Sequence, residues 1–236
     1  MKKSRIATLI VFFVLIPLTL IVGSRLSGRA FYVTSTLVIA ELLIPFFLAF
    51  EGRRPQAREL VVLAVMCALA VAGRVAIPIP SFKAIFGIIM IAGIAFGPES
   101  GFLVGAISAL ASNFFYSQGP YTPWQMMAYG AGGMLAGFVF AEGRLPRKPV
   151  VMGIFGFLAV AFFVGPLLDT CSVFLVMSRI SLKGAMAFYI SGFPVNLRQA
   201  VATANVLLVL GKPLLEKLDR IKTKYGILDD EGRKEA

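Results

Sequence analysis

One stretch of this chain, residues 100–141, runs for 42 residues without a charged side chain, and no other feature limits the possible folds as strongly. A helical crossing of a bilayer takes about 20 apolar residues, so this stretch is long enough for two crossings. Shorter charge-free runs cover residues 6–24, 84–97 and 149–168. The chain is 58% hydrophobic and 15% charged, whereas soluble domains are about 25% charged. The sequence therefore predicts an all-α integral membrane protein.

Apolar segments along the chain predict eight crossings. The first two, residues 6–22 and 31–50, form an N-terminal helix pair in domain 1–58. The first of them could instead be a secretory signal peptide, but it is long for one, and residues 23–29 offer no good small-x-small cleavage site. The remaining six crossings form a substrate-binding core, domain 59–211, followed by a tail, 212–236. Their expected ranges are 60–77, 84–96, 100–115, 123–141, 150–177 and 187–210.

The distribution of Lys and Arg predicts how the chain is oriented. With the N-terminus in the cytoplasm, the inside segments hold 16 of these cations and the outside loops hold 6. The positive-inside rule selects this arrangement, so we expect a multi-pass protein of the plasma membrane with both termini cytoplasmic. The net charge of +11 then follows from helix ends rather than from nucleic-acid binding. The tail could touch anionic lipid, although a solvated, partly helical tail is the expected state.

Missing residue types exclude several kinds of chemistry. The chain has no histidine, which rules out His-metal sites, Ser-His catalysis and imidazole proton relays. No Gly-rich phosphate loop followed by Lys-Ser or Lys-Thr occurs, so ATP would have to be hydrolysed by another chain. Cys67 and Cys171 lie in apolar segments and are expected to be packing residues. We predict no enzyme activity, no metal site and no cofactor.

Polar side chains within the apolar segments are candidates for a site, because they cost free energy in lipid unless they are paired. In the predicted topology, Asp169 and Arg198 lie at similar depth in the outer half of the membrane. They either form an ion pair or face a ligand cavity that opens outward. The other polar residues within these segments are Glu41, Asn113, Asn196 and Asn205.

The predicted outer loops carry a dense set of aromatic and amide side chains. Part of this set matches the aromatic belt of membrane proteins, which accounts for Tyr121 and for Trp124 in part. Amides suit the polar edge of a ligand, because they both donate and accept hydrogen bonds. The loop from Arg74 to Lys83 contains two prolines, lies on the same side and could cover such a pocket. The loop residues that we assign to substrate binding are Arg74, Lys83, Asn113, Tyr116, Gln118, Trp124 and Gln125.

Small residues recur at helical spacing in several segments. Gly101, Gly105 and Ala109 form one row, and Ala64, Ala68 and Ala72 form another. Such rows let helix backbones approach closely in a membrane. Packing within the bundle is the simpler interpretation, and a contact with another subunit is the alternative.

Several motifs resemble the substrate-binding S components of energy-coupling factor (ECF) vitamin importers. The likeness covers residues 59–210 and is clearest over 82–137, in FK at 82–83, IAGIAFGPESGFLVG at 91–105, SNFF at 112–115 and QGPYTPWQM at 118–126. The resemblance implies high-affinity capture of a vitamin near the outer face. It also implies docking onto one coupling transmembrane subunit and two ABC ATPases through an Ala-x-x-x-Ala pattern. Ala64 and Ala68 match that pattern, and Ala72 continues the row. The N-terminal helix pair departs from the many members that begin at the six-helix core.

The kind of ligand follows less directly from these motifs. The chain looks most similar to cobalamin-type S components, since a corrin has an apolar face and an amide-decorated rim. Riboflavin, pantothenate, folate and a queuosine precursor remain alternatives. The vitamin would be cargo rather than a cofactor. Competing hypotheses are a stand-alone ion-coupled carrier, motivated by Asp169, Arg198 and Glu41, and a membrane enzyme, for which no nucleophile with its base is found.

Overall fold

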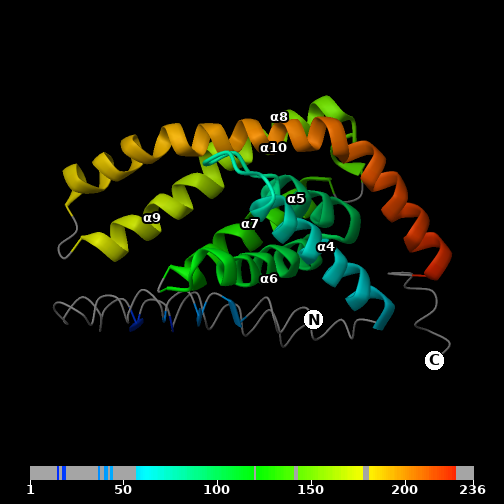
Figure 1. Cartoon of the computed structure of the whole chain (residues 1–236), viewed down its shortest axis with the longest axis horizontal. Helices are drawn as coiled ribbons and strands as arrows, with labels where there is room; N and C mark the ends of the chain where they lie inside the picture. The colour runs from blue at the N-terminus through cyan, green and yellow to red at the C-terminus, as the bar shows by residue number, and fades with distance from the viewer. Residues whose placement is uncertain are drawn as a thin grey trace.

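The computed structural model describes residues 57–119, 121–140, 143–177 and 181–226, together with eight single positions between 15 and 44. The predicted N-terminal helix pair lies outside the described residues except for those eight positions. Within the described part, the secondary structure is helical, without strands (Figure 1). The helices are α4 Ala57–Val75, α5 Ile85–Phe96, α6 Pro98–Tyr116, α7 Thr122–Phe140, α8 Pro149–Ala159, the π-helix η3 Val160–Val164, α9 Gly165–Val176 and α10 Leu182–Tyr225.

The helix lengths fit a bilayer. Among the described residues, Pro149–Val176 and Leu182–Tyr225 are long and apolar enough to cross a membrane. Helices α4, α6 and α7 have 19 residues each, or about 28 Å, close to the ~30 Å hydrocarbon core. The all-α prediction is confirmed for these residues, and the count of eight crossings stays a prediction.

Helix α5 is the centre of the bundle. It has only 12 residues, and all of them are buried, because α4, α6, α7 and α10 pack around it. Ile89, Met90 and Ile91 are fully inaccessible. A helix that is covered by protein on every side needs neither an amphipathic face nor the full length of a crossing. This explains why the corresponding sequence segment is short and uniformly apolar.

Glycines bring α5, α6 and α7 into backbone contact. A Cβ atom on Gly93 would lie 2.1 Å from the Gly133 carbonyl oxygen, and one on Gly101 would lie 2.5 Å from the same atom. A Cβ on Gly105 would lie 2.4 Å from the Tyr129 carbonyl oxygen. Real Cβ atoms do not approach so closely, so these positions require glycine. The glycine rows read from the sequence therefore pack inside the bundle.

The predicted crossing at 150–177 is one helical run with an irregular centre. Helices α8 and α9 are joined by the π-helical turn η3, and Pro166 follows directly. A π-helical turn shifts the register of the side chains that follow it. Pro166 lacks the amide hydrogen that a continuous helix would use, and a π-helical turn just before it is one of the irregularities that accompany such a break.

Helix α10 extends further than the sequence predicted. It has 44 residues, about 66 Å, and contains Pro194 and Pro213. Ser181 caps its start by accepting a hydrogen bond from the Gly184 amide, and Gly226 ends it in a left-handed conformation. The helix passes Leu210, the predicted end of the last crossing, without a break, and its last part belongs to the tail that we expected to be partly helical. The predicted boundary at 211–212 thus lies within a continuous helix.

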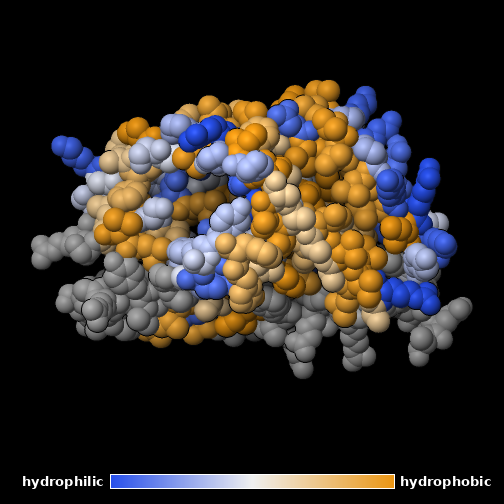
Figure 2. All heavy atoms as spheres, in the orientation of Figure 1, coloured by the Kyte–Doolittle hydropathy of each residue, from blue (hydrophilic) through white to orange (hydrophobic). Residues whose placement is uncertain are grey.

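The helices of the bundle finish at two opposite ends. Helices α4, α6 and α9 finish at what we call the polar end, where α5, α7 and α10 begin. Helices α5, α7 and α10 finish at the opposite end, which we call the basic end. Hydrophilic atoms gather at the basic end on the right of Figure 2, over the last part of α10 and the start of α8.

Candidate functional site

Arg74 lies at the end of α4 and connects it to α6. Its Nη1 atom donates hydrogen bonds to Ser112 Oγ, at 2.5 Å, and to Asn113 Oδ1, at 2.9 Å. Both acceptors are fully buried. The guanidinium group also stands 4.9 Å from the centre of the Tyr116 ring and 5.6 Å from that of Tyr129. Two aromatic faces and two neutral oxygens thus stabilise this cation, and no carboxylate of the described residues is among its contacts.

Asn113 carries the network from α6 into α7. Its amide nitrogen donates to Thr122 Oγ1, at 3.1 Å, and to Gln125 Oε1, at 2.8 Å. Thr122 in turn donates to Gln118 Oε1, at 2.9 Å. The Gln118 amide nitrogen reaches the carbonyl oxygen of Leu110, at 3.0 Å. Asn113 uses its acceptor and both of its donor hydrogens, so its orientation is fixed.

The loop between α4 and α5 folds back over this network. The Tyr116 hydroxyl donates to the Arg74 carbonyl oxygen, at 3.0 Å, and the Lys83 ammonium lies 6.0 Å from the centre of the Tyr116 ring. Lys83 Nζ also donates to the Ile77 carbonyl oxygen within the loop. The Lys83 carbonyl oxygen accepts from Gln199 Nε2 on α10, at 2.7 Å. The loop is therefore held to both α6 and α10.

Trp124, in the first turn of α7, faces α9 rather than the Arg74 network. It packs against Cys171 and lies 5.4 Å from Phe174, measured between ring centres. The side chain is buried, and its Nε1 atom has no hydrogen-bond partner in the described part of the protein. Gln125, the next residue, belongs to the Arg74 network. The first turn of α7 therefore connects the network to α9.

Asp169 on α9 pairs with α10 through Asn196 rather than through Arg198. The Asn196 amide nitrogen donates to Asp169 Oδ2, at 2.7 Å. Arg198 is exposed, and its Nε atom donates to the Pro194 carbonyl oxygen on its own helix, at 3.3 Å. Asp169 and Arg198 do not form an ion pair, because positions 196 and 198 are about 200° apart around a helix.

Two glycines make room for this pair between α9 and α10. A Cβ atom on Gly192 would lie 2.2 Å from Asp169 Oδ1, and one on Gly165 would lie 2.4 Å from Asn196 Cγ. Thr170 and Tyr189 share a further hydrogen bond across the same interface, at 2.8 Å. Asp169 is only half-buried. A carboxylate in this position keeps acceptor capacity for a further donor.

These contacts form a closed ring at the polar end. The first half of the ring leads from Arg74 through Asn113 and the start of α7 to Trp124, which contacts α9. The second half leads from α9 through Asn196 to Gln199 on α10, and the loop that carries Lys83 closes it. Figure 2 shows a recess edged by hydrophilic atoms in the left half of the view, between the areas that α9 and the α4–α5 loop occupy in Figure 1. Such a frame of aromatic rings and few polar groups is typical of small-molecule sites.

The structure thus brings together all but one of the site residues named from the sequence. Arg74, Asn113, Gln118 and Gln125 share one network; Lys83 and Tyr116 contact it, and Trp124 and Asp169 complete the ring. Arg198 points away from it. The sequence reasoning passed over Ser112, Thr122, Tyr129, Asn196 and Gln199 as binding residues. The sequence did single out Asn196 as an amide inside an apolar segment. For the other four residues it offers no indication beyond their position near residues already named.

The comparisons with known proteins identify one family. Residues 55–217 match the model of the family described as ECF-type riboflavin transporter, S component. The comparisons with curated proteins and with solved structures found no match. The family match spans more than half of the chain and covers every helix of the ring. Together with the motifs at 82–137, it shows that the chain belongs to the S-component family of ECF-type riboflavin transporters.

Proposed function

We propose that this chain captures a vitamin at its polar end and delivers it to an ATP-driven importer whose ATPases are separate subunits. The ring of contacts from Arg74 to Asp169 is the observation that carries the proposal. Its amides and hydroxyls are already fixed by one another, so a ligand would meet a site that needs little further ordering. The family is one of transport proteins, which fits the absence of histidine and of a phosphate loop from the sequence.

Riboflavin is the first ligand to test. The matched family carries riboflavin in its description, and no finding supports the preference for cobalamin that we drew from the sequence. A flat aromatic ring system would pack beside Trp124 and Phe174, which lie 5.4 Å apart between ring centres. Its hydroxylated side chain would place donors near the Asp169 carboxylate. Pantothenate, folate, cobalamin and a queuosine precursor belong in the same ligand panel.

We propose that α4 docks onto the coupling transmembrane subunit, which would carry two ABC ATPases. Ala64, Ala68 and Ala72 all lie exposed along one face of α4. Val61 and Val65 on the same helix are 64% and 52% exposed. A smooth apolar surface of this kind admits a partner helix at close distance. The matching row of small residues on α6 faces the bundle interior, so the exposed row on α4 is the one open to a partner.

The proposed orientation places the polar end outside and the basic end in the cytoplasm of a plasma-membrane protein. The described cations Arg144, Arg147 and Lys148, and those of α10 from Lys212 onward, all belong to the basic end. Cytoplasmic segments carry this excess of Lys and Arg.

A binding assay on the purified full chain in nanodiscs tests the capture step. Riboflavin fluorescence should be quenched with saturation, and Asn113→Ala should abolish the quenching while the protein still elutes as a single species. If none of the vitamins in the panel binds, the proposed function is wrong. Transport by the chain alone in proteoliposomes under an ion gradient would instead support the stand-alone carrier.

Replacing Ala64 and Ala68 with Trp tests the docking step. Uptake in cells should stop while riboflavin binding to the purified variant stays unchanged, because the side chains face away from the ring. Ala187→Trp, an exposed position on α10, is the matched control and should transport normally. Unchanged uptake by the α4 variant would contradict docking through this face.

A further inference from the structure

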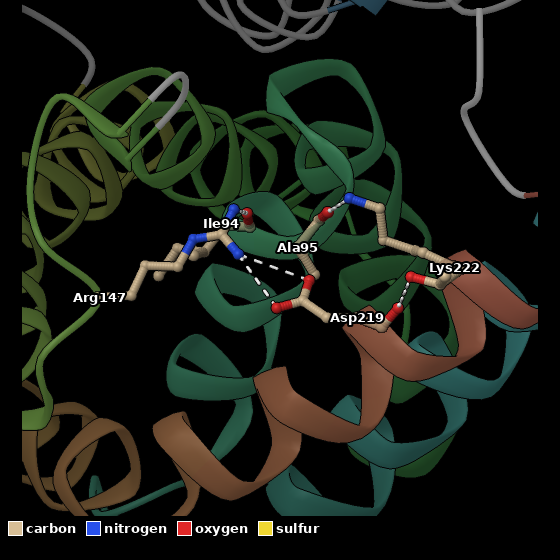
Figure 3. Close-up of polar contacts among 6 residues, drawn as sticks. Ile94, Ala95, Arg147, Asp219 and Lys222 are labelled. Atoms are coloured by element: carbon tan, nitrogen blue, oxygen red, sulfur yellow. Dashed lines mark hydrogen bonds and ion pairs between the residues drawn. The ribbon is translucent and has the colours of Figure 1, made fainter. Parts of the chain in front are cut away.

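The last part of α10, residues 211–225, lies across the basic end of the bundle. A Cβ on Gly211 would lie 2.8 Å from Met152 Cε, near the start of α8. Eleven residues later, Lys222 Nζ donates to the Ala95 carbonyl oxygen at the end of α5, at 2.7 Å (Figure 3). A helix rises about 16 Å over eleven residues, yet both Gly211 and Lys222 contact the ends of other helices. Figure 1 shows that α10 turns before its last part, which runs along the bundle end, and Pro213 inside this helix is a residue type that causes such kinks.

One face of this segment is bound to the bundle. Leu215 and Leu218 are buried. Asp219 pairs with Arg147 at 3.3 Å, and Arg147 also donates to the Ile94 carbonyl oxygen at 3.1 Å (Figure 3). The cations Arg147 and Lys222 thus meet the terminal carbonyl oxygens of α5, where the helix dipole favours positive charge. This face fixes how the segment is rotated.

The opposite face carries three exposed cations, Lys217, Arg220 and Lys224. Their spacing of three and four residues places them within about 60° of one another on the helix. The two described acidic residues of the segment are occupied elsewhere, since Glu216 pairs with Lys212 at 3.9 Å and Asp219 pairs with Arg147. Neither Lys217 nor Arg220 has an ion pair in the described part of the chain. Their charge is therefore available to an external anion.

We propose that Lys217, Arg220 and Lys224 bind the phosphate groups of anionic phospholipids in the leaflet around the basic end. The segment lies at the depth of the helix ends, which is where lipid headgroups surround a membrane protein. Interfacial helices bind anionic lipid partly through Lys and Arg on their polar face, and this segment carries the same side chains while its apolar face packs on the bundle instead of on acyl chains. Cations close to the membrane surface attract anionic lipid strongly.

This inference uses the proposed orientation only to name the leaflet as cytoplasmic, and it does not depend on the vitamin. An acidic surface of a partner subunit is the competing occupant. Lipid is favoured because headgroups lie at this depth whether or not a partner is docked, and because long Lys and Arg side chains extend toward phosphates while their helix stays in place.

Titration of phosphatidylglycerol into the detergent-solubilised full chain, read by thermal stabilisation and by lipid adducts in native mass spectrometry, tests the proposal. Phosphatidylcholine is the neutral comparison. The triple variant K217Q/R220Q/K224Q should bind phosphatidylglycerol about 10- to 100-fold more weakly, as expected for the loss of three surface cations. Its stability in phosphatidylcholine should match the wild type, because none of the three side chains holds the fold.

Three further variants separate the effect of charge at this face from the effect of charge elsewhere on the protein. The charge-conserving K217R/R220K/K224R should keep the wild-type affinity for phosphatidylglycerol, and Glu216→Gln should strengthen it. Lys183→Gln, at the other end of α10, should leave it unchanged. Equal lipid affinity in the wild type and the triple variant would overturn the proposal. If the triple variant keeps lipid but fails to co-purify with the energising subunits, the face binds protein instead. Vitamin binding should be the same in all of these variants, so a failed vitamin assay does not bear on the lipid result.

Discussion

The two ends of the bundle use the same kinds of polar residue in different ways. At the polar end, side chains bind to one another: Arg74 to Asn113, Asn113 to Gln125 and Asn196 to Asp169. At the basic end, Arg147 and Lys222 bind the backbone carbonyls of α5. Backbone carbonyls are present in any sequence, whereas a chain of side-chain partners needs each residue type to match. The polar end is therefore far more sensitive to single changes, as expected for a recognition site.

The core between the two ends should be the region where a single substitution lowers the stability most. Replacing Gly133 with Val should cause the largest loss, because a Cβ there would lie 2.3 Å from the Gly101 carbonyl oxygen. Backbone cannot move aside as a side chain can, so we expect destabilisation of more than about 4 kcal/mol and no folded protein. Yield of monodisperse protein measures this. Ala187→Val, which is exposed, should express normally; equal yields would contradict the close packing of α6 and α7.

Replacing Asn113 with Leu should cause the next largest effect. The change removes a fully buried amide that bonds to the half-buried Arg74 and Gln125 side chains, and buried polar groups without partners cost about 1–3 kcal/mol each. Thermal unfolding should show a stability loss of about 3 kcal/mol, and vitamin binding should disappear. Asn205→Leu is the control, since Asn205 is exposed on α10. If both variants lose the same stability, the network has no special importance.

Replacing Asp169 with Asn should weaken ligand binding rather than folding. The amide still fits the niche made by Gly165 and Gly192 but removes the charge that strengthens a hydrogen bond from a donor, so affinity should fall about tenfold. Calorimetry or fluorescence titration measures it. Asp219→Asn removes the same charge at the basic end and should leave vitamin affinity unchanged. A similar drop in both variants would mean that net charge, rather than contact, is responsible.

Replacing Arg147 with Gln should have the smallest effect. Its side chain and that of Asp219 are 41% and 47% exposed, and solvent-exposed ion pairs contribute about 0–1 kcal/mol. Unfolding should shift by no more than about 1 kcal/mol, with vitamin affinity unchanged. Lys212→Gln, in an exposed pair with Glu216, should shift it still less. A loss as large as that of Asn113→Leu would remove the contrast between the two ends.

The sequence predicted most helices and the main polar cluster for identifiable reasons. Long runs without charge determine where membrane helices lie. Asn113 and Gln125 stand on either side of a short loop that contains Gln118, and a short loop places the three residues close together. Arg74 and Lys83 bound another loop on the same side, so the predicted topology already placed them near the amides.

The rotation of a helix about its own axis was harder to predict from the sequence than the presence of the helix. Only the packed structure shows that Asn196 faces α9 while Arg198 is exposed and faces away. Charge was taken as the end of the last crossing, so the sequence did not predict that one continuous helix extends to Tyr225. Leu214, Leu215 and Leu218 recur there at helical spacing, which was the available signal. The π-helical turn at Val160–Val164 has no comparable mark in the sequence.

The glycine contacts between α5, α6 and α7 have a mechanical consequence. Where two backbones touch without side chains between them, there is no deformable layer that would let one helix slide past its neighbour. These three helices must then translate and tilt as one rigid block, carrying Asn113 and Trp124 with them. Any movement that takes a ligand across the bilayer would thus reorient the whole block, and the freedom to open the recess is left to α9, the first half of α10 and the α4–α5 loop.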